Sequence, residues 1–270
     1  MANPQPKLSP YVKSGAATIG ALTGAALQAV TGDSVAASTA GAAFGALLDD
    51  IGTRLLSARE SARIQLASSF AASAIKDRYE AGHDYRADDF FEADPYTRSS
   101  FEEVAEGVLL AAQKEHEELK VPFMGYLLAN IAFEETIDRT TANWAIRTSS
   151  DLSWTQLMLL ALIESDAHAL PHVRIGDFSR SWDNWSAHKE LMDLHTARGL
   201  IGAPGGKTER LGLSYINNNL ADMSLSSGGR LLFGLMQLEN IDRQPLDELY
   251  GRLVVIDEGA DTPPPVNPSD

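Results

Sequence analysis

The chain lacks cysteine and is short of basic residues. Without cysteine, disulfide bonds and thiolate metal sites are excluded, as is the zinc deaminase chemistry that needs a P-C-x-x-C motif. The 37 acidic residues outnumber 22 Lys and Arg, which gives a formal net charge of −15. A general nucleic-acid binder needs a broad basic surface that displaces counterions, so the overall charge argues against that class.

Motifs of catalysis and cofactor binding are absent as well. The histidines form no H-E-x-x-H pattern, and no G-x-S-x-G nucleophile elbow occurs. The string GAPGGKT at 202–208 is similar to a phosphate-binding loop, but Ile201 replaces the first glycine and Pro204 lacks a backbone N–H. We therefore expect a protein that is not an enzyme, with no cofactor and no metal site.

Long apolar runs are also missing, although the N-terminal part has two uncharged segments. Residues 14–32 and 34–48 carry no charge, and Asp33 separates them at a predicted turn. Two G-x-x-x-G pairs are formed by Gly20, Gly24, Gly41 and Gly45. Because this spacing lets helix backbones approach closely within lipid, it predicts a Gly/Ala-rich helical hairpin, a glycine zipper, at or in a membrane.

The hairpin is weakly apolar. Four strongly apolar side chains per arm contribute only about −0.3 to −0.6 kcal/mol each. At ~1.5 Å per residue the arms would be about 28 and 22 Å long, against a hydrocarbon core of about 30 Å. We expect insertion that depends on oligomerisation or on a trigger, with a hairpin buried in a soluble bundle as the alternative. No secretory signal is visible, so the expected location is the inner membrane, or the cytoplasm with conditional membrane association.

Five regions are predicted along the chain. Residues 1–13 form a flexible lead and residues 257–270, rich in proline, a disordered tail. Residues 14–79 hold the hairpin and a long helix, whose apolar or small stripe is Phe44, Leu48, Ile51, Leu55, Ala58, Ala62, Leu66 and Phe70. Such a stripe needs partner helices in the same chain or in a homo-oligomer. Residues 80–150 and 151–256 are the two remaining domains.

Residues 80–150 are predicted to form an acidic helical bundle. Ser100-x-x-Glu103 is a capping box, Pro122 begins a second helix, and a third covers about 140–147. The acidic cluster comprises Glu102, Glu103, Glu106, Glu115, Glu117 and Glu118, with His116 among them. A di-metal bundle needs Glu-x-x-His pairs on facing helices, and this run holds one histidine, so we interpret the cluster as a solvated acidic face.

Residues 151–256 are predicted to form a winged-helix-like α+β module. Ser153-x-x-Gln156 caps a first helix, an extended piece covers 172–175, and a second helix covers about 181–197. Short strands near 199–202 and 223–225 enclose a Gly/Pro-rich loop, and a helix follows over 230–240. This order is that of a winged helix, within a fold that is mainly α overall.

The segment 170–210 carries a slight positive charge within this acidic chain. Its six Lys and Arg residues against five carboxylates leave it at +1, so a ligand with phosphates would find a favourable potential here. The candidate ligand-binding residues are Arg174, Arg180, Trp182, Lys189, Arg198, Lys207 and Arg210. Trp182 and Trp185 can stack on bases, but core anchoring is expected for at least one of them.

Two stretches carry a resemblance to a known family. EVAEGVLL at 103–110 and KVPFMGYLLANIAF at 120–133, with the winged-helix-like module and the Gly/Ala-rich hairpin, resemble membrane effectors of bacterial anti-phage defence. In particular, the chain resembles the channel-like effectors of the Hailong system. That resemblance implies a partner nucleotidyltransferase whose single-stranded DNA product binds the soluble part and holds the effector inactive.

The expected function is therefore an oligomeric, channel- or pore-like membrane effector of antiviral abortive defence. Binding of an oligonucleotide or nucleotide to the soluble domain would control it. A soluble winged-helix transcriptional regulator is the alternative, and a structural oligomer without a ligand is a third class.

Overall fold

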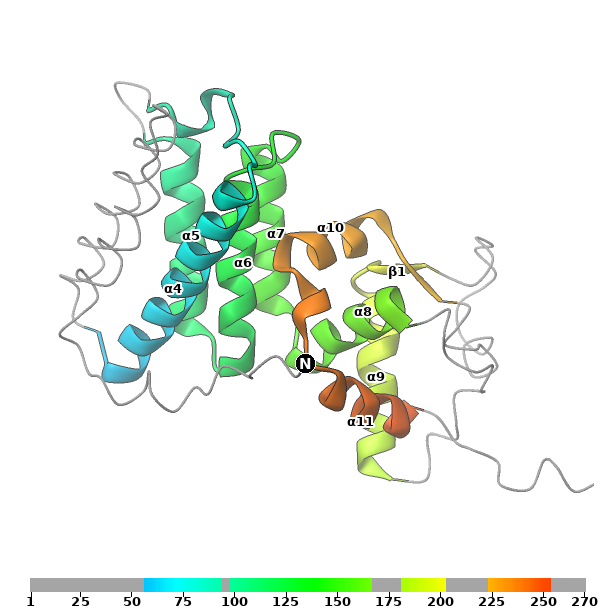
Figure 1. The fold of residues 1–270 in the computed structure, drawn as a ribbon. Helices are drawn as coiled ribbons and strands as arrows, with labels where there is room; N and C mark the ends of the chain where they lie inside the picture. The colour runs from blue at the N-terminus through cyan, green and yellow to red at the C-terminus, as the bar shows by residue number, and fades with distance from the viewer. Residues whose placement is uncertain (1–55, 94–97, 167–180, 203–222, 254–270) are drawn as a thin grey trace, which may run out of the picture. The chain divides into compact units, whose positions relative to one another are not determined.

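The computed structural model describes residues 56–93, 98–166, 181–202 and 223–253. Over these ranges the chain is mainly helical, with eight α-helices and one two-stranded sheet (Figure 1), which confirms the mainly α prediction. The Gly/Ala-rich hairpin at 14–48 lies outside the described residues. The chain divides into two compact units, Met1–Leu157 with Leu231–Asn240, and Met158–Arg230 with Ile241–Asp270.

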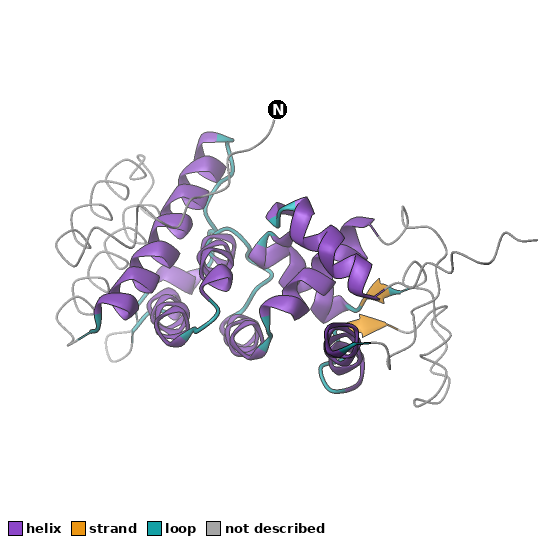
Figure 2. Ribbon diagram, turned by 90° about the horizontal axis from the view of Figure 1, so that it is seen from below, coloured by secondary structure: helices purple, strands orange, loops and turns teal. Residues whose placement is uncertain are grey.

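Four helices form the body of the first unit. They are α4 (Ala58–Glu80), α5 (Ser100–Lys114), α6 (Val121–Ile131) and α7 (Arg139–Asp151), with the 3-10 turns η1 (Asp89–Phe91) and η2 (Glu118–Lys120) between them. Helix α6 packs against the other three, and α4 runs obliquely across it (Figures 1 and 2). Every residue of α6 except Tyr126 is buried, which explains why its sequence is apolar on all sides.

Small residues let α4 and α6 approach closely. Ala67 and Ala71 of α4 are fully buried, and a Cβ atom on Gly125 of α6 would lie 2.5 Å from the Ala67 carbonyl oxygen. A real Cβ would clash at that distance, so only glycine permits this backbone separation. The predicted stripe on this helix is wrong in phase: Leu66 is buried as expected, but Ala58 is exposed.

Local capping residues set where the helices begin. Ser57 has an extended backbone and forms a capping box with Glu60, so α4 starts at Ala58 and the predicted long helix does not continue through Ser57. The capping box of α5 is Ser99 with Glu102, one residue before the predicted pair. The box at Ser153 and Gln156 is confirmed, because each side chain bonds the other residue's backbone N–H.

Helices and two short strands form the second unit. It contains most of α8 (Trp154–Asp166), α9 (Trp182–Thr196), β1 (Ile201–Gly202), β2 (Ser224–Leu225), the start of α10 (Ser227–Met236), and α11 (Arg243–Leu253). The strands pair antiparallel, with Ile201 opposite Leu225. The predicted helix at 181–197 and the strand near 223–225 are confirmed. The predicted helix at 230–240 starts earlier, and α11, which packs against α9, was not predicted.

The first turn of α10 lies on the end of the α9–β1 connection. A Cβ on Gly229 would lie 2.2 Å from the Leu200 carbonyl oxygen, which accepts a hydrogen bond from the Ser226 N–H at 2.9 Å. The glycine therefore places the start of α10 directly against the chain that leads into β1.

A search of the described residues for membrane spans finds no helix with both the length and the apolar character to cross a bilayer.

Candidate functional site

The described residues contain three of the seven predicted ligand-binding side chains. Trp182 and Lys189 lie on α9, and Arg198 follows its C-terminal end. Outside the described residues lie Arg174, Arg180, Lys207 and Arg210, together with the zipper glycines Gly20, Gly24, Gly41 and Gly45.

Two tryptophans at the start of α9 are exposed and stacked on each other. Trp182 is 73% exposed and Trp185 42%, with ring centroids 4.9 Å apart and ring planes 27° from parallel. The expectation that at least one indole anchors the core is therefore wrong. Large aromatic side chains are usually buried, so an exposed pair marks a surface suited to a ligand or partner.

The buried face of α9 explains this exposure. Its core contacts come from Ala187, Leu191 and Leu194, which recur at helical spacing. Trp182 and Trp185 are three residues apart on another side of the helix, in the first turn that follows the Ser181 N-cap. The sequence spacing correctly places both indoles on one face of α9. The opposite face, which carries Ala187, Leu191 and Leu194, is the one that packs into the core, so the indoles remain exposed.

Lys189 continues the same face, and Arg198 does not. Lys189 is exposed and lies four residues after Trp185, the spacing at which helical side chains are neighbours. The Arg198 Nε atom lies 3.5 Å from a carboxylate oxygen of Asp193, so part of its charge is already balanced. We call the surface made by Trp182, Trp185 and Lys189 the indole face.

Most carboxylates of the acidic cluster in the first unit are bonded within the protein, so its interpretation as a solvated face holds for the exposed Glu118 and is wrong for the buried Glu115. Glu102 caps α5, Glu106 pairs with Arg98 at 2.6 Å, and Glu103 accepts a hydrogen bond from Asn143. These carboxylates connect the start of α5 to its surroundings, a structural role that the sequence spacing does not reveal.

Glu115, His116 and Glu117 bring three potential metal ligands within 4.8 Å of one another, but two of them already have other partners. The buried carboxylate of Glu115 lies 2.5 Å from the ammonium of Lys120, which is 1% exposed. A carboxylate oxygen of Glu117 accepts the Trp154 backbone N–H at 2.9 Å. The group is thus an ion pair and a helix cap in the structure.

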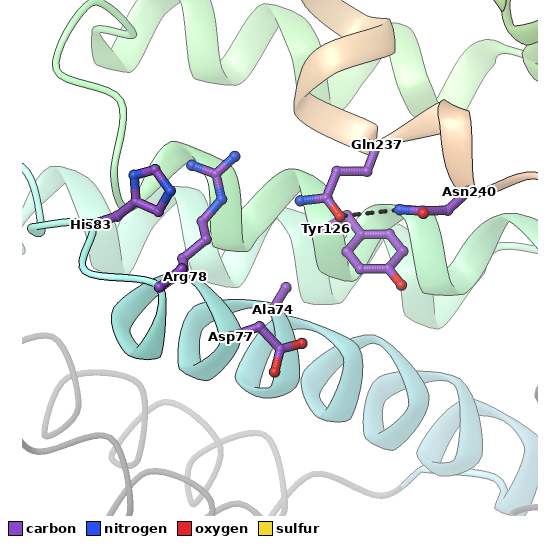
Figure 3. Close-up of a pocket in the computed structure, with 8 residues that line it drawn as sticks. Ala74, Asp77, Arg78, His83, Tyr126, Gln237 and Asn240 are labelled. Carbon is purple, nitrogen blue, oxygen red and sulfur yellow. Dashed lines mark hydrogen bonds between the residues drawn. The ribbon is translucent and has the colours of Figure 1, made fainter. Parts of the chain in front are cut away.

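A polar pocket in the first unit was missed by sequence reasoning. It lies between α4, α6 and the segment that follows α10, and Arg78, His83, Tyr126 and Asn240 are among its lining residues (Figure 3). These residues come from distant parts of the chain and share no motif, so no sequence signal could have found it.

Comparison with protein families, curated proteins and solved structures finds no match to this chain.

Proposed function

We propose that the protein is a non-enzymatic, oligomeric membrane effector of antiviral defence, controlled by single-stranded nucleic acid that binds the second unit. The observation that carries the proposal is the indole face, an exposed and stacked tryptophan pair with a lysine beside it. The uncharged Gly/Ala-rich arms and the resemblance to channel-like defence effectors support the membrane role.

Stacked indoles suit unpaired bases better than a duplex. Every base has a π-face, and stacking on an aromatic side chain contributes about 1–3 kcal/mol per base without sequence preference. In a duplex the bases stack on each other and are not available to a side chain on a flat helix face. Lys189 on the same face adds a phosphate contact, in the segment whose charge is +1.

The binding test uses the full chain, a fluorescent single-stranded oligonucleotide and the matching duplex. Replacing Trp182 or Trp185 by alanine should weaken single-strand binding by about 5- to 150-fold, from the stacking energy above. Tyr79→Ala, which removes an exposed aromatic ring from the first unit, is the matched control and should leave binding unchanged. Fluorescence anisotropy measures each affinity. Equal affinities for the parent and both tryptophan variants would refute the assignment.

The membrane test addresses the glycine zipper. Gly24→Leu and Gly41→Leu enlarge the G-x-x-x-G positions and should reduce toxicity and membrane depolarisation on expression, because close helix packing would be lost. Ala42→Leu adds a similar volume outside the glycine pairs and is the control. Undiminished toxicity in both glycine variants, at equal protein level, would contradict the membrane role.

The strand pair favours a second candidate, a winged-helix regulator that binds duplex DNA. Strands β1 and β2 stand between α9 and α10, the order that a winged-helix module requires. Such a regulator would bind the duplex more tightly than the single strand, with an affinity that falls steeply with salt. The two nucleic acids in the same titration therefore distinguish the candidates.

A further inference from the structure

The polar pocket of the first unit is large enough for a small metabolite. Its volume is about 350 Å³, within the range of ligand sites. Figure 3 shows Arg78 and His83 at one end, and Tyr126, Gln237 and Asn240 at the other. Asp77 on α4 lies between the two ends in this view.

The amide wall of the pocket is held in place from the core. The buried Asn130 donates a hydrogen bond to the Leu235 carbonyl at 2.7 Å and accepts one from the Gln237 side chain at 3.3 Å. Gln237 in turn accepts a hydrogen bond from the Asn240 amide at 3.2 Å. This chain of amides orients Asn240 before any ligand arrives.

Gln237 itself has a backbone conformation that supports this placement. Its φ of 50° lies in the left-handed region, and it is the one non-glycine residue with positive φ among those described. A left-handed residue is common where a helix ends, and Gln237 directly follows the last residue of α10. Its backbone N–H donates to the Gly234 carbonyl at 3.2 Å, and its side chain donates to Asn130 at 3.3 Å.

The other end of the pocket carries the positive charge of Arg78. Within the part of the chain that the structure describes, Arg78 has no ion-pair partner, and its guanidinium carbon lies 5.7 Å from the ring centroid of Phe133, a contact that leaves its N–H donors available. By contrast, Arg86 and Arg98 each pair with a carboxylate. In a chain of net charge −15, an arginine without a carboxylate partner at a pocket suits an anionic ligand.

The pocket also offers an acceptor in its middle and a hydroxyl donor at the amide end. Asp77 is exposed and supplies carboxylate oxygens. Burial raises the pKa of Tyr126, and the negative charges of Asp77 and Glu239 raise it further, so its hydroxyl remains a hydrogen-bond donor at neutral pH. A simple anion would be repelled by Asp77, so the ligand must also carry hydroxyl or amino donors.

We propose that this pocket binds a nucleoside monophosphate. Arg78 and His83 take the phosphate, Asp77 accepts the ribose hydroxyl groups, and the Asn240 amide with the Tyr126 hydroxyl bonds the base edge. The site is in a different unit from the indole face and takes a free nucleotide, so it is independent of the function proposed above.

Isothermal titration of the full chain with each nucleoside monophosphate, adenosine and inorganic phosphate tests the proposal. At least one monophosphate should bind more tightly than both the nucleoside and phosphate. Arg78→Gln should weaken that binding by about 10- to 100-fold, the loss expected for hydrogen bonds to a charged group. Arg59→Gln makes the same charge change on an exposed arginine of the same helix and should leave the affinity unchanged.

Two further variants separate this site from others. Asn240→Ala should weaken the monophosphate without changing phosphate binding, whereas Trp182→Ala should not affect either. Circular dichroism confirms that each variant is folded. Absence of monophosphate binding, phosphate binding as tight as that of the nucleotide, or full binding by a folded Arg78→Gln variant would each overturn the proposal.

Discussion

Replacing Lys120 by methionine should destabilise the first unit by about 3 kcal/mol. Lys120 and Glu115 are a buried ion pair, 1% and 5% exposed, at 2.5 Å between Nζ and Oε2. The ammonium also donates to the Ser150 carbonyl at 3.2 Å, which links the start of α6 to the end of α7. Methionine has a similar length but leaves the Glu115 carboxylate buried without a counter-charge.

The size of this stability loss depends on the contacts that the Glu115 carboxylate keeps in the variant. Removal of one partner from a buried pair typically costs about 3–5 kcal/mol. One Glu115 oxygen still accepts the Glu117 backbone N–H at 2.9 Å, and the imidazole of His116 lies 3.6 Å away. Both contacts reduce the penalty on the carboxylate, so the lower end of the range, about 3 kcal/mol, is expected.

Urea unfolding followed by circular dichroism measures the change as a shift in midpoint at constant slope. Lys114→Met is the matched control, because Lys114 is exposed in the last turn of α5 and should lose less than about 1 kcal/mol. Adding Glu115→Gln to Lys120→Met should recover much of the stability, since the amide keeps the acceptor and removes the charge. A loss no larger than that of Lys114→Met, or a double variant less stable than Lys120→Met, would refute this reasoning.

Three further predictions concern stability. Gly125→Ala should destabilise the protein by about 2 kcal/mol, because overpacking of up to about 3 kcal/mol exceeds the helix-propensity gain of about 1 kcal/mol. The control is Gly234→Ala, where a Cβ would meet open space, and it should be neutral or stabilising in the same urea assay. Hydrogen bonds with Ser57 and Gln113 lower the pKa of Glu60 from 4.5 to about 2, so the stability that its carboxylate contributes is complete above pH 4.5 and is lost as pH falls toward 2. The melting temperature of a Glu60→Gln variant should therefore depend less on pH over that window. Burial lowers the pKa of His188 from 6.5, so the folded chain resists its protonation and stability should fall as pH drops below 6.5; His188→Gln should remove that component of the pH profile.

Local chemistry explains why several elements could be predicted. Ser153 with Gln156 and the Ser181 N-cap act within three residues, so their sequence patterns suffice to locate the starts of α8 and α9. At α5 two capping patterns overlap by one residue, and local sequence does not choose between them. Ser99 becomes the cap in the structure, where it is buried and Phe101 joins the core.

Side-chain roles were harder to predict because they depend on which face of a helix packs against a neighbouring helix. Helical spacing places Trp182 and Trp185 on one side of α9, but packing of α9 against α11 leaves both indoles exposed. Likewise, Glu115 looks like part of an acidic run until Lys120 is seen buried beside it.

The sequence by itself determined the helical class, the capping box at Ser153 and Gln156, the uncharged Gly/Ala-rich arms and the absence of thiol chemistry, because these depend on composition or on neighbours within one helical turn. Tertiary structure decided the α4–α6 contact at Gly125, the exposure of the indole face and the pocket that joins Arg78 to Asn240. Those features join residues far apart in the chain, and only the packing of whole helices brings such residues together.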